Sequence, residues 1–170
     1  MNTLRITTAA VLAFAALAAH AADGLSKNDR EFFTKAAAGG MYEVEAGKLA
    51  ESRGTDPAVK AYGSMLVKDH GTANDELKAL ASRKGVTLPA ALPGDKQKRL
   101  DKLSKEKNFD KEFVEEVGLD DHKKDIALFE KASKGADDAD VKAFATKTLP
   151  TLKMHREHAE GMKKQMKGKS

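Results

Sequence analysis

Three histidines lie on the apolar faces of helical stretches, where a titratable ring is unexpected. At the spacing i, i+3, i+4 and i+7, His70, His122 and His155 each fall in an apolar stripe on one face of a helix. Such a stripe is expected to face the interior of a helical bundle. Their neighbours in these stripes are Leu66, Ala73 and Leu77; Gly118 and Phe129; and Leu152 and Ala159. Neutral imidazole binds transition metals through either ring nitrogen. The spacing therefore predicts three imidazoles that point into one interior.

Carboxylates accompany these rings. Glu43 flanks the inward face of the first helical stretch, Asp69 precedes His70, and Asp121 precedes His122. Carboxylate and imidazole together suit iron, manganese, zinc or copper in a helical bundle. The predicted metal ligands are His70, His122, His155, Glu43, Asp69 and Asp121. The alternative is a buried polar layer in which carboxylates satisfy structural imidazoles.

The same residues limit the chemistry. Di-iron bundle proteins use Glu-x-x-His on two helices, whereas this chain offers Asp69-His70 on one and His155-x-x-His158 on another, which argues against ferroxidase chemistry. With no cysteine there is no thiolate ligand and no covalent haem attachment. The cofactor is thus left open, with a transition metal as the candidate.

A second group of soft ligands runs along the last helical stretch. It contains Met154, His158, Met162 and Met166 at i+4 spacing. Thioether and imidazole bind cuprous ion, but methionines also fill irregular gaps in a core. Both interpretations stay open.

The elements that position these residues are helices. Ser26 and Asp56-Pro57 are typical of helix starts, and Gly54 and Gly135 of helix ends. The expected long helices span 27–53, 57–84, a third from Asn108 or Asp110 to 135, and 138–166 with a bend at Pro150. A short helix capped by Asp95 is expected to end at 103. Nothing shows the alternation of β-strands. The predicted fold class is all-α.

The chain repeats at an offset of 81 residues. The repeated segments are Asp29–Phe33 with Asp110–Val114, 52–54 with 133–135, and Val59–Tyr62 with Val141–Phe144 after one inserted residue. Each half is expected to form a helical hairpin. The long connection, 86–108 with its short helix, favours a crossover and hence a ferritin-like four-helix bundle, although an up-down-up-down bundle is the alternative.

Glycines inside the predicted helices suggest where bulky groups fit. A glycine in a helix costs about 1 kcal/mol relative to alanine. Counting from the hairpin turns, Gly39 and Gly40 are expected opposite His70, and Gly118 opposite His155. The sequence therefore predicts that these glycines make room for the imidazole rings.

The N-terminus has the features of a secretory signal. A cationic start, Met1–Arg5, precedes the apolar run Ile6–Leu17 and the small-x-small site Ala19–Ala21. Residues 1–21 are the predicted signal peptide and 22–170 the mature bundle domain, expected in the periplasm. The apolar run is too short for a lasting span, so an integral membrane protein is not expected.

Composition excludes several classes of function. The formal charge of +4, with 33% charged residues of both signs and no Trp, indicates a solvated surface without a nucleic-acid site. No phosphate-binding loop or nucleophile motif is present, so no catalytic residue is predicted. The lysine-rich end, 163–169, suits a helix C-terminus or an anionic lipid surface. No partner is indicated, and a homo-oligomer is left open.

The combined motifs resemble the exported bacterial family called domain of unknown function 4142, which is described as ferritin-like. The residues that carry the resemblance are Phe33, Ala36, Gly40, the segment EVEAGKL at 43–49, Met65, Asp69-His70, Leu88-Pro89, Phe109-Asp110, His122, Leu149-Pro150 and His155. It covers Asn28 to Ala159. The resemblance implies a periplasmic helical domain without an assigned activity.

Two functional hypotheses follow from the sequence. The first is a non-enzymatic envelope or stress-associated binding module whose histidines are mainly structural. The alternative is a transition-metal binding or redox protein that uses the core cluster of histidines and carboxylates.

Overall fold

The computed structural model describes residues 24–168, and within them every regular element is helical, as predicted. The elements are α1 (Lys27–Arg53), α2 (Pro57–Arg83), α3 (Gly94–Leu103), α4 (Phe109–Phe113), the π-helical η1 (Val114–Asp121), α5 (His122–Gly135) and α6 (Ala139–Gly168). The predicted signal segment 1–21 lies outside the described residues. Pro150 lies inside α6.

Capping residues fix the start of α1 and α2. The Ser26 hydroxyl accepts a hydrogen bond from the Asp29 amide at 3.1 Å, and the Asp56 carboxylate accepts one from the Ala58 amide at 2.9 Å. The two helices then pack closely against each other because Gly47 faces Gly63. A Cβ atom at Gly63 would lie 2.7 Å from the Gly47 carbonyl oxygen. Only glycine permits this approach.

The third rod differs from the single α-helix expected from Asn108 or Asp110 to Gly135. It is built from α4, η1 and α5, with π-helical turns over Val114–Asp121. A π-helical turn holds more residues than an α-helical one and shifts the faces that follow it. His122 is the first residue after this segment, so the π-helical turns set the direction in which its ring points.

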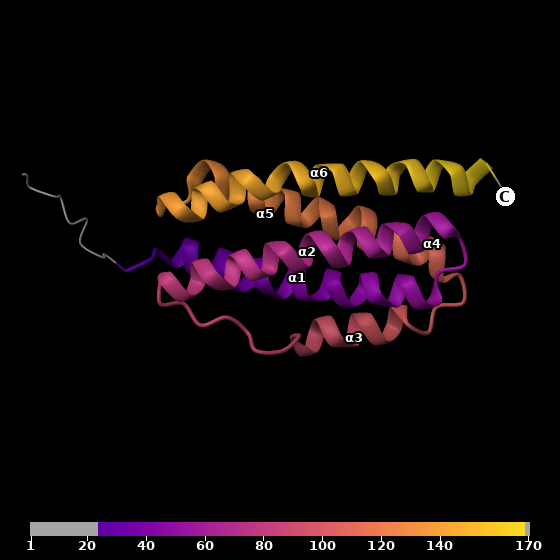
Figure 1. Cartoon of the computed structure of the whole chain (residues 1–170), viewed down its shortest axis with the longest axis horizontal. Coiled ribbons are helices and arrows are strands. Elements are labelled where there is room, and N and C mark those ends of the chain that lie inside the picture. Colours follow the sequence, from indigo (N-terminus) through magenta and orange to yellow (C-terminus); the bar gives the residue numbers. More distant parts are fainter. Residues whose placement is uncertain (1–23, 169–170) are drawn as a thin grey trace, which may run out of the picture.

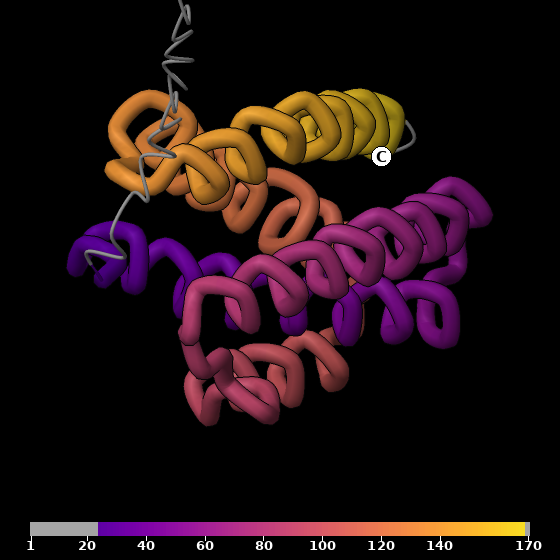
Figure 2. Tube along the Cα trace, turned by 60° about the vertical axis from the view of Figure 1, so that its left-hand side comes forward, coloured from indigo at the N-terminus to yellow at the C-terminus, as the bar shows by residue number. Residues whose placement is uncertain are grey.

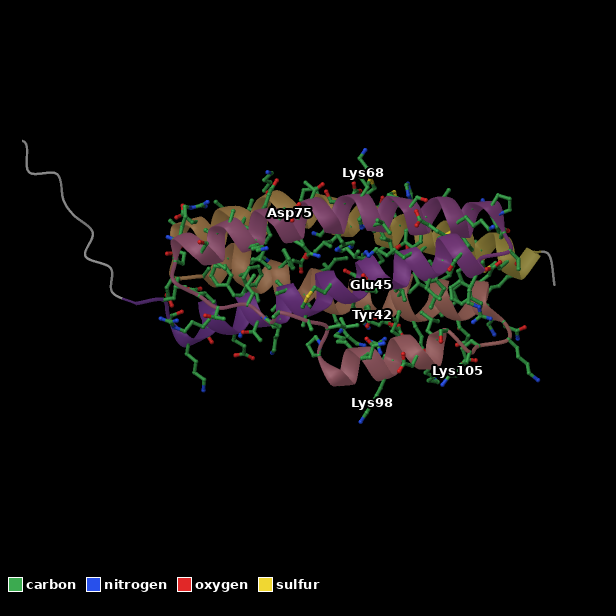
Figure 3. The ribbon with its side chains drawn as sticks, turned by 60° about the horizontal axis from the view of Figure 1, so that its bottom comes forward. Tyr42, Glu45, Lys68, Asp75, Lys98 and Lys105 are labelled. Atoms are coloured by element: carbon green, nitrogen blue, oxygen red, sulfur yellow. The ribbon has the colours of Figure 1, made fainter. Side chains whose placement is uncertain are left out.

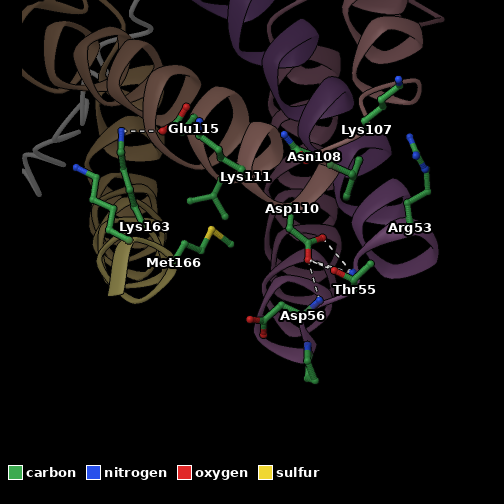
Figure 4. Close-up of a pocket in the computed structure, with 14 residues that line it drawn as sticks. Arg53, Thr55, Asp56, Lys107, Asn108, Asp110, Lys111, Glu115, Lys163 and Met166 are labelled. Carbon is green, nitrogen blue, oxygen red and sulfur yellow. Dashed lines mark hydrogen bonds and ion pairs between the residues drawn. The ribbon is translucent and has the colours of Figure 1, made fainter. Parts of the chain in front are cut away.

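Polar contacts at the two ends of the molecule establish how the rods run. The Asp110 carboxylate accepts hydrogen bonds from the amides of Thr55 and Asp56, so the third rod begins beside the α1–α2 turn (Figure 4). At the other end, Lys84 forms ion pairs of 2.7 Å with Asp138 and with Asp140, at the start of α6. α2 and the third rod therefore run in the same direction, and the connection that carries α3 returns along the molecule (Figure 1).

The internal repeat reappears as a pair of equivalent caps. Asp29 accepts a hydrogen bond from the Asp138 amide at 3.0 Å, and Asp110 accepts one from the Asp56 amide at 2.8 Å. Asp29 and Asp110 are separated by the repeat offset of 81, and Asp56 and Asp138 by 82 because of the inserted residue. An aspartate at the start of one half thus caps the second long helix of the other half.

The interior consists of two apolar clusters with a polar layer between them. One cluster is built around Phe32, Phe129 and Phe144, and the other around Tyr62 and Phe113. α1 with α2 and α5 with α6 form the two sides that enclose them, while α3 lies on the outer side of α1 (Figure 2).

Charged side chains lie on the outside of this bundle. Lys68 and Asp75 project outward from α2, and Lys98 and Lys105 project from α3 and the turn that follows it (Figure 3). The polar groups of the central layer are different, because they are buried.

Candidate metal centre

The three predicted histidines meet in the buried central layer. His70 comes from α2, His122 from the start of α5 and His155 from α6. The relative exposure is 5% for His70 and 0% for the other two. Their ring centroids are 5.2–5.5 Å apart, and one ring nitrogen of each lies within 4.8 Å of the other two. The sequence prediction that they converge is therefore confirmed.

Glu43 of α1 closes one side of this group. Its Oε2 lies 3.0 Å from Nδ1 of His70, and its Oε1 lies 3.2 Å from Nδ1 of His122. The Glu43 side chain is 1% exposed, so water does not compete for these contacts. One carboxylate thus orients two of the three rings.

Asp69 orients the third ring. Its Oδ2 lies 3.0 Å from Nε2 of His155, and its side chain is 26% exposed. Asp69 precedes His70 on α2, so adjacent residues serve different rings: His70 enters the cluster itself, and Asp69 reaches across to α6.

The hydrogen bonds fix the tautomers. A carbonyl oxygen can only accept, so Nδ1 of His122, which lies 2.8 Å from the Val117 oxygen, carries a proton. A carboxylate also accepts, so the proton of neutral His155 lies on Nε2, facing Asp69. When both rings are neutral, the lone pairs on His122 Nε2 and His155 Nδ1 then face each other at 3.2 Å. Two such lone pairs repel unless a proton or another cation lies between them.

His70 supplies a third nitrogen of the same kind. Its Nδ1 faces Glu43, while its Nε2 is buried without a hydrogen-bond partner. A buried nitrogen without a partner costs free energy. The three rings together present Nε2 of His70, Nε2 of His122 and Nδ1 of His155 as acceptors without a protein donor.

Burial and neighbouring charges both shift the pKa values of the groups in this layer. Burial alone would raise the pKa of Glu43, but the electrostatic influence of the neighbouring His70 and His122 rings outweighs burial and lowers that pKa to about 2. Burial, together with the Glu43 charge, raises the pKa of Asp125 well above its ordinary range. Burial lowers the pKa of His155 to about 4 in spite of Asp69. At neutral pH, Glu43 is therefore ionised and His155 is a neutral donor ligand, while Asp125 is protonated more readily than an ordinary aspartate.

The dimensions fit a transition metal. With metal–nitrogen distances of 2.0–2.1 Å, two ligands of a tetrahedral site lie about 3.3 Å apart. The His122–His155 separation of 3.2 Å matches this value, and the third nitrogen lies close enough to reach it by side-chain rotation. The carboxylates of Glu43 and Asp69 bind the opposite ring nitrogens, as the outer partners of metal-bound histidines commonly do.

Asp121 does not join the cluster. Its carboxylate accepts two hydrogen bonds from the Arg99 guanidinium, at 3.0 and 2.8 Å, and it also pairs with Lys124 at 3.3 Å. Asp121 thus secures α3 to the third rod. The residue that approaches Glu43 is instead Asp125, three positions after His122, a spacing that the sequence displays.

The glycines do not make room for the rings as expected, and the correction is specific. A Cβ atom at Gly39 would lie 3.3 Å from Asp125 Oδ1, and one at Gly40 would lie 2.0 Å from Asn74 Oδ1. A Cβ atom at Gly118 would lie 2.6 Å from the Cβ of Ala159. Gly39 and Gly40 therefore leave room for Asp125 and for the Asn74 amide, and Gly118 lets η1 pack closely against α6.

The methionine group on α6 does not share one environment. Met154 is 38% exposed, His158 is also exposed, and Met162 is buried. Met65 of α2 joins His158 and Met162 along a surface groove. The residues with this i+4 spacing therefore lie along the boundary between α2 and α6 and do not form one continuous row of metal ligands.

The largest cleft described, of about 1000 Å³, lies at the other end of α6 from Ala139 and away from the histidines (Figure 4). Arg53, Lys107, Lys111, Lys163 and Lys167 contribute positive charge to its walls. Lys163 pairs with Glu115 at 3.1 Å. Over residues 24–168, no helix combines the length and apolar character needed to cross a membrane.

Comparison with known proteins identifies the fold and the family. A crystal structure of a DUF305 fragment from Deinococcus radiodurans is similar, with a TM-score of 0.72 and 11% sequence identity, over 84% of this chain and 99% of that chain. The similarity supports the helical fold alone. A search of curated proteins found no match. The model of the family described as "Domain of unknown function (DUF4142)" matches residues 14–162, and the chain belongs to this family.

Proposed function

We propose that this protein binds one divalent transition metal through His70, His122 and His155. The observation that supports this most strongly is the convergence of three buried ring nitrogens, one on each of three rods, that face no protein donor. Glu43 and Asp69 hold the opposite nitrogens and so orient the rings toward the metal. The ligand atoms are Nε2 of His70, Nε2 of His122 and Nδ1 of His155.

The ligand types narrow the choice of metal. Imidazole suits zinc, copper, iron and nickel, while magnesium and calcium prefer oxygen ligands. The chain has no cysteine, so cuprous ion has no thiolate partner here. Zinc, ferrous iron and cupric ion are the candidates, and zinc is the first to test because it accepts three imidazoles.

The wider setting is also a proposal. The two halves of the internal repeat and the returning connection favour a ferritin-like bundle of two hairpins. The N-terminal segment 1–21 favours export, which makes the periplasm the proposed compartment. The precursor and mature masses of the protein, measured in a bacterium that expresses the full chain, test the cleavage after Ala21.

Metal content and stability test the binding directly. Tag-free protein is loaded with zinc, freed of excess metal and analysed for bound zinc, and its melting temperature is compared with that of the metal-free form. We expect one zinc per chain and a higher melting temperature, because a ligand that binds only the folded state stabilises it. His70→Gln and His155→Gln should each abolish stoichiometric binding.

His158→Gln is the matched control, because His158 is an exposed histidine on the same helix as His155. It should bind zinc like the unmodified protein. If the unmodified protein takes up no zinc, iron or copper, the metal proposal is wrong. The first hypothesis from the sequence would then be favoured: a structural histidine layer in an envelope binding module, which the ring contacts to Glu43, Asp69 and Val117 support.

A further inference from the structure

A small cavity adjoins the histidine layer. Its volume is about 20 Å³, which is enough for one water molecule. Its polar lining consists of Glu43, His70, Asn74, Asp125 and Thr148. A buried water needs two to four polar partners, and these side chains supply them. The remaining walls are apolar and include Leu77, Phe129 and Phe144.

The cavity lies on one defined side of the layer. Along α2 its lining residues Ala73 and Leu77 follow His70, and along α6 Thr148 and Leu152 precede His155. Because these two helices run in opposite directions, both pairs are displaced toward the same end of the bundle. Asp125 and Phe129 of α5, and Ala36 and Gly40 of α1, are displaced in that direction too.

The opposite side of the layer is closed by packing. The Tyr62 ring lies 6.5 Å from the His122 ring and 6.4 Å from the His155 ring, between centroids. Gly118 and Ala159 approach so closely next to it that a Cβ atom at Gly118 would lie 2.6 Å from the Cβ of Ala159. The Tyr62 side therefore leaves no room for a further ligand to a metal in the layer, whereas the cavity side does.

Gly40 allows a polar side chain to line the cavity. A Cβ atom at Gly40 would lie 2.0 Å from Asn74 Oδ1, so an alanine there would displace the amide. Gly40 thus lets the Asn74 side chain reach the cavity wall. The cavity therefore has polar groups on one part of its wall, where a small polar ligand could be held, and apolar side chains on the rest.

We infer that the metal centre has an exchangeable fourth ligand position that faces this cavity. The inference rests on the proposed function, since three histidines leave one position of a tetrahedral metal for water or another ligand. The ligand class is set by the volume: water, hydroxide or a diatomic anion, with larger molecules excluded. The site is then an open centre that binds small inorganic ligands, and not a closed structural one.

Cobalt substitution tests this inference, because the visible absorption of Co²⁺ reports its coordination sphere. The full chain is loaded with Co²⁺ and titrated with cyanide, and in parallel with imidazole, and the cobalt content is measured after each titration. We expect cyanide to change the cobalt bands at constant cobalt content, and imidazole to leave them unchanged because the cavity is too small for it. This comparison needs no variant.

A cavity-filling variant tests whether cyanide binds the metal from this cavity. Ala73→Val should bind cobalt with the same stoichiometry, yet lose most of the cyanide response, because the added methyl groups occupy the cavity. Ala79→Val is the matched control: it makes the same change on the exposed face of α2 and should respond like the unmodified protein.

The outcomes separate the two proposals. Bound cobalt that ignores cyanide, or an undiminished response in folded Ala73→Val, overturns the open position and leaves metal binding intact. A response to imidazole equal to that to cyanide overturns the size limit and with it this cavity as the ligand position. A protein that binds no cobalt overturns both.

Discussion

Glu43→Gln is the most informative single substitution at this centre. The amide keeps the shape of the side chain but removes the negative charge, and its nitrogen cannot accept a hydrogen bond. In the native structure the two carboxylate oxygens face Nδ1 of His70 at 3.0 Å and Nδ1 of His122 at 3.2 Å. In the variant, one of these two ring nitrogens therefore loses its carboxylate partner.

The expected magnitude follows from that geometry. Loss of an outer partner of a metal-bound histidine weakens metal affinity about 10- to 100-fold. Because Glu43 orients two of the three rings, we expect the upper end of this range, about 100-fold or roughly 2.7 kcal/mol. Zinc affinity is measured by competition with a chromophoric chelator at fixed pH, on tag-free protein whose helical content is checked by circular dichroism.

The control lies two residues away. Glu45→Gln removes the same charge from the same helix, but Glu45 pairs with Lys48 at the surface, at 2.7 Å. It should leave zinc affinity within about twofold of the unmodified protein, since surface ion pairs contribute little. Equal affinities of folded Glu43→Gln and Glu45→Gln would refute the role assigned to Glu43.

Three further predictions concern stability. The His155 pKa of about 4 lies below its ordinary value of 6.5, so the unfolded chain binds a proton that the folded chain does not. The metal-free protein should therefore lose roughly 3 kcal/mol of unfolding free energy between pH 6.5 and 4. An unfolding free energy from urea titrations that does not change over this pH range would contradict the prediction. Gly63→Ala should destabilise the protein by about 1–3 kcal/mol because its Cβ would meet the Gly47 carbonyl, whereas Gly71→Ala, with open space around it, should stabilise it by up to about 1 kcal/mol. Thermal melts that rank these two variants in the reverse order would contradict the packing described. Asp110→Ala should lower the unfolding free energy by about 1 kcal/mol, the usual value of a cap, and an unchanged denaturant midpoint would count against the cap.

The sequence predicts the helices and the inward histidines well because both follow from the 3.6-residue period. Caps such as Ser26 and Asp56 and the breaks at glycine mark the long helices, and the stripes on α2 and α6 bring His70 and His155 inward. Both signals are local. They need no knowledge of how the rods are placed against one another.

The partners of these residues depend on placement, and there the prediction fails in places. The π-helical turns before His122 shift the phase of the third rod, so Asp121 faces Arg99 of α3 instead of the cluster. No period shared by α-helices indicates such a shift. The glycines were assigned to the histidines by counting from the turns, but the relative slide of the rods brings Asp125 and Asn74 opposite Gly39 and Gly40.

The family assignment adds no mechanism, so the centre is defined by its chemistry alone. Three imidazoles, each with its opposite nitrogen held by a carboxylate or a carbonyl, are more than a polar layer needs. Such a layer needs only paired donors and acceptors, whereas His70 Nε2 has no partner and the lone pairs of His122 and His155 face each other. A cation bound between the rings would be a partner for all three of these ring nitrogens.

Anomalous diffraction at the zinc absorption edge tests that claim most directly. Crystals of the tag-free protein, grown with one equivalent of zinc, should give one strong anomalous peak between the three rings, about 2.0–2.1 Å from one nitrogen each of His70, His122 and His155. An anomalous peak held by other residues, or an interior without one while zinc is bound elsewhere, would contradict the account.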